Sequence, residues 1–138
     1  MRYQSYKDLE VHQIAHKLAI EVHRMSLTKL PKFEMYEEGQ QIRKSSKSVA
    51  NTIVEGFGRR RYKNDFILFL TYALASCDET REHLATLFET ESLKDKEIFD
   101  YFVSNYDVLG KKLTKFIQAV EQGHLTPKAS IQNPGSRI

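Results

Sequence analysis

The chain has 138 residues, 41% of them hydrophobic, and a net charge of +3, values typical of a single domain with one core. Its only cysteine, Cys77, excludes an intramolecular disulfide, fits a reducing cytosol and suits a small buried side chain. The first residues lack the apolar stretch of a signal peptide, and no run approaches the roughly 18 apolar residues of a membrane helix. We therefore expect a cytoplasmic protein with no membrane partner.

The first predicted helix opens where Ser5 and Asp8 have the spacing of a capping box. Its apolar residues recur at helical spacing and place one broad face on a core: Leu9, Val11, Ile14, Ala15, Leu18, Val22 and Met25. A separate strip carries His12, His16 and His23, whose spacing suits either one metal ion or contacts with a partner. Because the sequence specifies no further ligand, we expect a polar flank or a subunit seam, and no metal.

A proline marks the connection that follows. Pro31 disfavours helical backbone at Leu30 and removes a backbone donor, so the first helix ends before it. Leu30, Phe33 and Tyr36 are too apolar for a free loop. We expect these three residues to fold back as a lid over one end of the bundle.

The second predicted helix lies within residues 40–64, where Ile42, Val49, Ala50, Ile53 and Phe57 form an apolar stripe that faces the core. This span holds seven basic residues and one acidic residue, a local charge of +6 that exceeds the +3 of the whole chain. The basic residues are Arg43, Lys44 and Lys47 on the helix, and Arg59, Arg60, Arg61 and Lys63 after it. We expect them to bind nucleic acid, because lysine and arginine neutralise phosphates.

The third predicted helix runs from Asp65, after an N-cap at Asn64, to about Thr90. Its first part, residues 66–75, is apolar on every side, so the rest of its own bundle covers only one face. So short a segment cannot span a bilayer, and the expected cover is another copy of the chain. The predicted subunit interface consists of Phe66, Ile67, Leu68, Phe69 and Tyr72.

The fourth predicted helix follows a capping-box candidate formed by Ser92 and Asp95. Its apolar residues alternate at four and three positions, the spacing of a bundle seam: Phe102, Tyr106, Leu109, Leu113, Phe116 and Val120. Gly123 suits a left-handed stop after this helix. Four helices with short links predict an all-α fold, an antiparallel up-down-up-down four-helix bundle over residues 1–123, followed by a flexible C-terminal tail at 124–138.

The remaining polar residues indicate a charged surface rather than an active site. Residues 77–107 hold nine acidic and three basic residues, a local charge of −6, so the bundle should have an acidic side and a basic side. A di-iron site needs Glu-x-x-His on two helices, and the sequence does not carry two such motifs. Glu34, Glu55 and Glu79 suit capping or hydrogen-bonding roles more simply than an acid cluster. We therefore expect no enzyme activity and no cofactor.

A series of residues between positions 6 and 120 matches a known family. The matching residues are Leu30-Pro31, Glu34, Tyr36, Gln41-Ile42-Arg43-Lys44, Ser48-Val49, Ile53-Val54-Glu55-Gly56, Gly58-Arg59, Ala73, Ser76 and Glu79. With these residues the chain resembles the four-helix bundle proteins encoded in intervening sequences of bacterial 23S ribosomal RNA genes. Two positions depart from the family's pattern, since His12 stands where tryptophan is common and Thr52 where asparagine is common.

The resemblance implies an antiparallel bundle that assembles as a ring-like homopentamer. It also implies a relation to accessory proteins of diversity-generating retroelements, which are basic pentameric barrels that bind a reverse transcriptase and nucleic acid. Two functions are then open. The protein is either a homo-oligomeric scaffold that binds RNA or DNA through its basic residues, with avidity from the ring, or a protein-interaction adaptor such as a reverse-transcriptase accessory subunit. In the second case the basic strip meets an acidic partner, and nucleic acid has no role.

Overall fold

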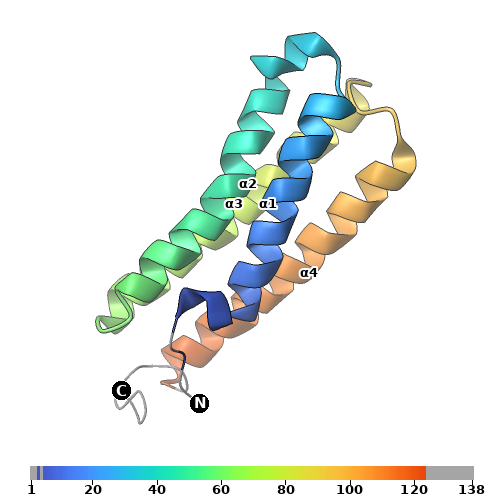
Figure 1. Ribbon diagram of the computed structural model, residues 1–138. Coiled ribbons are helices and arrows are strands. Elements are labelled where there is room, and N and C mark those ends of the chain that lie inside the picture. Colours follow the sequence, from blue (N-terminus) through green and yellow to red (C-terminus); the bar gives the residue numbers. More distant parts are fainter. Residues whose placement is uncertain (1–2, 4, 124–138) are drawn as a thin grey trace.

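Four long helices build the protein in the computed structural model, which describes Tyr3 and residues 5–123 (Figure 1). They are α1 (Glu10–Thr28), α2 (Glu38–Gly58), α3 (Lys63–Glu89) and α4 (Lys96–Glu121). Two short 3-10 helices, η1 (Tyr6–Asp8) and η2 (Lys32–Met35), precede α1 and α2. The described residues include no strand, and the predicted all-α four-helix bundle is confirmed. The tail predicted for residues 124–138 lies outside the described residues.

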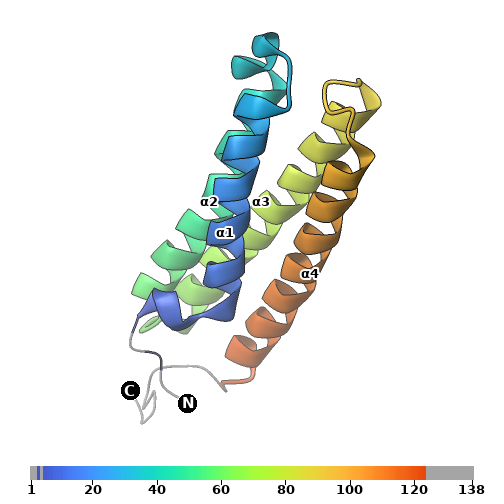
Figure 2. The same ribbon diagram turned by 45° about the vertical axis from the view of Figure 1, so that its right-hand side comes forward.

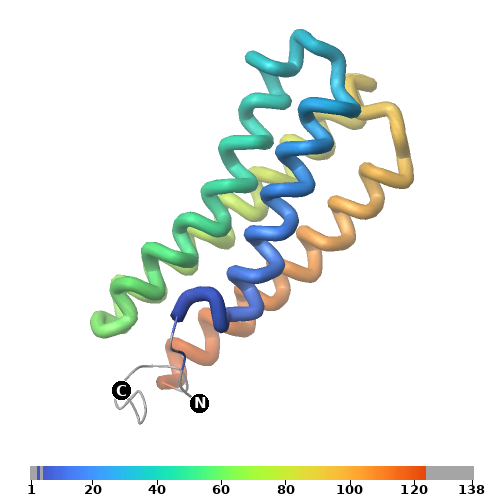
Figure 3. The backbone as a smooth tube through the Cα atoms, in the orientation of Figure 1, coloured from blue at the N-terminus to red at the C-terminus, as the bar shows by residue number. Residues whose placement is uncertain are grey.

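Successive helices run in opposite directions along the bundle, so α1 and α3 point one way and α2 and α4 the other (Figure 1). In Figure 2, α1 and α4 approach each other at the end where the chain begins and diverge toward η2. The smooth backbone trace shows that each connection between helices is short (Figure 3). No helix in the described part of the chain is long and apolar enough to cross a membrane.

One hydrophobic core follows the bundle axis. The predicted stripe of α2, from Ile42 to Phe57, is buried at every position, and the stripes of α1 and α4 are buried apart from Ile14 and Phe116, which are partly buried. Each fully buried leucine or isoleucine stabilises the fold by roughly 1.5–3 kcal/mol relative to an exposed one. Hydrophobic periodicity therefore predicted the inward faces correctly.

The start of α1 differs from the prediction. Ser5 Oγ accepts a hydrogen bond from the backbone N of Lys7, and the backbone N of Ser5 donates to Asp8 Oδ2 at 3.0 Å. This capping box caps the start of η1 rather than the start of α1. The two helices are separate because Leu9 between them has extended backbone, with ψ of 124°. The regular helix begins at Glu10.

The predicted starts of α3 and α4 are also corrected. Asn64 is not an N-cap, since α3 already begins at Lys63. At α4 the cap is Asp95, whose Oδ1 accepts from the backbone N of Glu97 at 3.0 Å and of Ile98 at 3.2 Å. Ser92 takes no part in this cap. The predicted stop after α4 is confirmed at Gly123, where φ is +82°.

A buried carboxylate, rather than a hydrophobic lid, holds the connection between α1 and α2. Phe33 and Tyr36 are 60% and 78% exposed, so the predicted lid is wrong for both, and only Leu30 packs against the core. Glu34 is buried instead. Its Oε1 accepts from the backbone N of Gly39 at 2.9 Å, and its Oε2 accepts from Ser92 Oγ at 2.6 Å. Glu34 thus joins the first connection to the loop between α3 and α4, which confirms its predicted hydrogen-bonding role.

Candidate nucleic-acid interface

The turn between α2 and α3 holds four of the seven predicted basic residues. Three of them, Arg59, Arg60 and Lys63, contact other groups of the bundle. The Arg59 guanidinium lies 3.5 Å from Glu55 Oε2 and 3.6 Å from Asp65 Oδ2. The same group lies 4.6 Å from the centre of the Phe69 ring. Arg59 therefore links the end of α2 to the start of α3, with two carboxylates balancing its charge.

Arg60 and Lys63 act as caps on helix ends. Arg60 donates to the backbone O of Phe57 at 2.9 Å and lies over the Phe57 ring, 3.9 Å from its centre. Burial lowers the pKa of Arg60 from its ordinary value. Lys63 Nζ donates to the backbone O of Glu121 at 2.7 Å. Both cations thus satisfy carbonyls at helix C-termini, where the helix dipole favours positive charge.

Arg61 and Tyr62 lie in the same turn as Arg59. Both are exposed, and Arg61 makes no salt bridge within the described part of the chain. The turn therefore offers one uncompensated arginine beside one exposed aromatic ring, fewer contacts than the sequence predicted.

A second group of cations lies on α2 and on the neighbouring end of α1. Lys44 and Lys47 are exposed on α2, and Arg24 is exposed on the neighbouring α1. None of the three makes a salt bridge with any described residue. His23 Nδ1 lies 3.0 Å from Lys47 Nζ, and the charge of Arg24, the next residue of α1, also acts on His23. Lys44 lies one turn before Lys47 on α2. We call Arg24, Lys44, Lys47 and His23 the basic seam.

The pKa of His23 responds to the cations near it. The pKa of His23 is lowered from its ordinary value first by burial and then by the charges of Lys47, Arg43 and Arg24. Cations held this close without a carboxylate create a positive potential that attracts anions. The seam can therefore hold phosphate groups.

Arg43 lies next to the basic seam and forms hydrogen bonds within the bundle. Its guanidinium donates to Ser26 Oγ at 3.0 Å and to the backbone O of Met35 at 2.6 Å. These bonds tie α2 to the end of α1 and to η2. The donors of Arg43 are therefore used within the bundle, whereas the sequence predicted a direct phosphate contact.

The structure divides the predicted basic residues into two groups. Lys47 and Arg59 are twelve positions apart, which corresponds to about 18 Å along a helix. Asn51 and the paired Glu55 lie between them on the exposed side. Sequence reasoning also missed Arg24, because only the packing of α1 on α2 brings its neighbour His23 within 3.0 Å of Lys47. The histidine strip that ends at His23 was the sequence feature that could have indicated this part of α1, because His23 is next to Arg24.

The opposite flank of α2 is joined to α3 by polar contacts. Ser45 and Thr80 share a buried hydrogen bond of 2.8 Å, and Ser48 and Ser76 one of 3.0 Å. Nearby, His83 lies between two carboxylates, 2.6 Å from Glu38 Oε2 and 3.3 Å from Glu79 Oε2. These contacts fix the register of α2 on α3, so the basic seam rests on a rigid support.

One residue of the predicted subunit interface lies in the core of its own chain, and the other four are partly buried or exposed. Phe66 is 1% exposed, because the Phe57 and Phe116 rings of its own chain pack against it at 6.5 and 5.9 Å between ring centres. Phe66 therefore belongs to the core, while Ile67 and Phe69 are partly buried. Leu68 and Tyr72 are 44% and 47% exposed on the outer face of α3.

The acidic residues and the cysteine considered in the sequence lie apart from one another in the described part of the chain. Among the described residues no three His, Cys, Asp or Glu side chains could hold a metal ion together. Glu34, Glu55 and Glu79 have separate partners, as given above. Cys77 is buried, and its burial raises the thiol pKa to about 12, so it is an inert core residue as predicted.

Comparison with known proteins places this geometry in a family. A solved structure from Bacteroides thetaiotaomicron, described as a protein with unknown function from the S23 ribosomal protein family, shares the fold with a TM-score of 0.70 and 22% identity over 78% of this chain and 97% of that chain. No curated protein matches the sequence. The family model of the 23S rRNA-intervening sequence protein matches residues 7–115. Because this match covers most of the bundle, the chain belongs to the 23S rRNA-intervening sequence protein family.

Proposed function

We propose that this protein is a non-enzymatic, homo-oligomeric scaffold that binds nucleic acid through the basic seam. One observation carries the proposal: Lys47 lies 3.0 Å from His23, Arg24 is next to His23 on α1 and Lys44 is one turn before Lys47 on α2, and none of these three cations makes a salt bridge with a described residue. A polyanion balances these charges and releases its own counterions on binding, which supplies affinity without reading sequence.

The turn residues extend the same surface. Arg61 adds one phosphate contact, and the exposed Tyr62 beside it suits stacking on a base. Each copy then offers only a few contacts, which bind weakly alone. Repetition of the seam in an oligomer raises the affinity through effective concentration, without any new contact.

Binding of a single-stranded RNA of about 20 nucleotides, measured by fluorescence anisotropy, tests this proposal. The double variant Lys44→Glu/Lys47→Glu should lower affinity at least about tenfold and reduce the slope of log affinity against log salt by about 1.4, or 0.7 for each phosphate contact. The matched control is Lys94→Glu/Lys111→Glu, the same charge change at exposed lysines away from the seam. Unchanged binding by the seam variant, or an equal loss in the control, contradicts the proposal.

The second candidate is a protein-interaction adaptor, such as an accessory subunit of a reverse transcriptase. The exposed Leu68 and Tyr72 on α3 favour it, since a protein partner covers apolar side chains and a nucleic-acid backbone does not. In that case a stable complex with one defined protein forms and stays free of nucleic acid after nuclease treatment. Loss of the complex on nuclease treatment favours the scaffold.

A further inference from the structure

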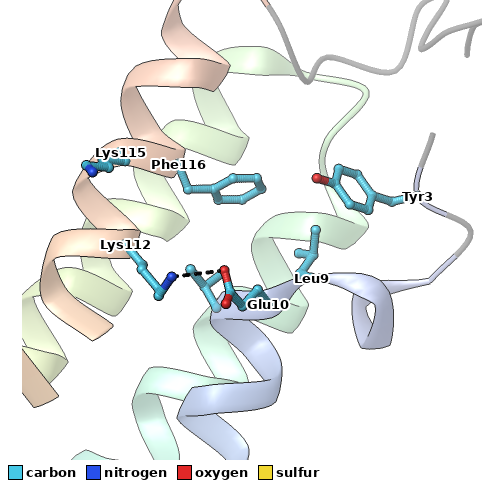
Figure 4. Close-up of a pocket in the computed structure, with 7 residues that line it drawn as sticks. Tyr3, Leu9, Glu10, Lys112, Lys115 and Phe116 are labelled. Atoms are coloured by element: carbon cyan, nitrogen blue, oxygen red, sulfur yellow. Dashed lines mark hydrogen bonds and ion pairs between the residues drawn. The ribbon is translucent and has the colours of Figure 1, made fainter. Parts of the chain in front are cut away.

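A pocket separate from the basic seam lies where the start of the chain meets the end of α4 (Figure 4). Its volume is about 300 Å³, at the small end of ligand pockets. Leu9 and Val11, both buried, line it from the start of α1, and Phe116 lines it from α4. Of these three apolar side chains, the partly buried Phe116 reaches solvent, while Leu9 and Val11 form the floor behind it.

The aromatic wall of this pocket is held in place. Phe116 packs edge-on against Phe66 of the core, with 5.9 Å between ring centres. Tyr3 lies on the opposite side, and its hydroxyl points into the pocket toward Phe116 (Figure 4). Burial, and then the charge of Asp8, raise the pKa of Tyr3, so its hydroxyl keeps its proton and can donate a hydrogen bond.

The rim of the pocket carries positive charge. Lys112 Nζ lies 3.2 Å from Glu10 Oε1, and these two charges balance. Lys115 is exposed at the outer rim, where its side chain extends away from Phe116 into solvent (Figure 4), and it makes no salt bridge within the described residues. An occupant should therefore combine a flat apolar part, a hydrogen-bonding edge and one anionic group.

We propose that this pocket binds a single nucleotide. The base lies against Leu9, Val11 and Phe116, the Tyr3 hydroxyl hydrogen-bonds to the edge of the base, and Lys115 binds the phosphate. This site deepens the proposed function, on which it rests, by giving a bound strand a place for one unstacked base, because stacking on an aromatic ring tolerates any base. The small volume and the single unpaired cation suit one nucleotide rather than a peptide or a lipid chain.

The direct test is titration of the protein with adenosine monophosphate while the methyl signals of Leu9 and Val11 are followed by NMR. Saturable shifts at millimolar concentrations are expected, and inorganic phosphate alone should leave these methyl signals unchanged. Phe116→Leu keeps the apolar volume but removes the ring, and should weaken binding about tenfold. Lys115→Gln should weaken it about fivefold, whereas the control Lys111→Gln, at an exposed lysine outside this pocket, should not.

These results separate the pocket from the proposed function. Lys44→Glu/Lys47→Glu should leave mononucleotide binding unchanged, because the seam lies toward the other end of α1. Mononucleotide binding without RNA binding would overturn the scaffold and support the pocket. RNA binding with no saturable methyl shift, or with equal losses in Lys115→Gln and Lys111→Gln, would overturn the pocket and leave the scaffold standing. A failure of both ligands overturns both.

Discussion

Lys47 Nζ lies 3.0 Å from Nδ1 of His23, so a cation of α2 donates a hydrogen bond to a histidine of α1. A lysine ammonium has only donors, and Nδ1 must therefore accept, which requires an unprotonated nitrogen at this position. Protonation of His23 replaces this bond by repulsion from Lys47, Arg43 and Arg24. The histidine thus couples the charge of the seam to pH.

The free protein should lose stability as the solution becomes acidic. The pKa of folded His23 lies below its ordinary value of 6.5, so the unfolded chain binds the proton more readily. The stability linked to His23 is therefore complete above pH 6.5 and is lost as pH falls through the lower folded pKa. His23→Gln does not titrate and should show a smaller loss between about pH 7.5 and 5.5 in denaturant unfolding. An identical loss in both proteins would contradict the assignment.

Nucleic-acid binding should have the opposite pH dependence. A phosphate in the basic seam compensates Arg24 and Lys47 and favours protonated His23, so by linkage affinity rises as pH falls. Anisotropy with single-stranded RNA should show binding at least about threefold tighter at pH 5.5 than at pH 7.5 for the native protein, with most of this gain absent in His23→Gln. His16→Gln, at an exposed histidine of the same helix, should keep the gain. A gain that persists in His23→Gln places the titrating group elsewhere.

Periodicity predicted the stripes of α2 and α4, because burial of one helix face leaves a repeat that is visible in the sequence. It could not predict what a polar side chain contacts across the bundle. Glu34 and Ser92 are 58 positions apart, and the Arg43 contact with the Met35 carbonyl depends on how η2 folds back. The separation of the basic residues into two groups could not be predicted for the same reason. Charge counts do not reveal that Arg59 pairs with Glu55 or that Lys63 donates to the Glu121 carbonyl.

Two glycines at the end of α2 should respond to alanine in opposite ways. A Cβ on Gly56 would lie 3.0 Å from Phe69 Cβ, because α2 and α3 pack closely there, whereas a Cβ on Gly58 meets nothing within 4 Å. Gly56→Ala should therefore destabilise the protein by about 1–3 kcal/mol. Gly58→Ala should stabilise it by up to about 1 kcal/mol, since alanine favours helix. Denaturant unfolding measures both, and equal effects would contradict the close approach at Gly56.

The hydroxyl of Tyr106 is buried and has no hydrogen-bond partner among the described residues. Burial accordingly raises its pKa well above the ordinary value. Tyr106→Phe removes an unsatisfied polar atom and should raise the free energy of unfolding by about 1 kcal/mol. Tyr101→Phe is the control, because its exposed hydroxyl donates to Glu21 Oε1 at 2.7 Å and its loss should be slightly destabilising. A clear loss of stability in Tyr106→Phe would mean that a water molecule satisfies the hydroxyl.

Self-association should depend on the outer face of α3, where Leu68 and Tyr72 are exposed beside the partly buried Phe69. A second copy that covers this face would bury apolar surface, and a carboxylate placed there would have to lose its water without a partner. Light scattering should therefore give an oligomer for the native protein. Leu68→Glu/Tyr72→Glu should raise the dissociation constant at least about thirtyfold with unchanged helix content. Val108→Glu, the same kind of change at a residue of equal exposure on α4, should leave the oligomer intact. A monomeric native protein, or an oligomer that survives both α3 substitutions, would place assembly elsewhere or exclude it.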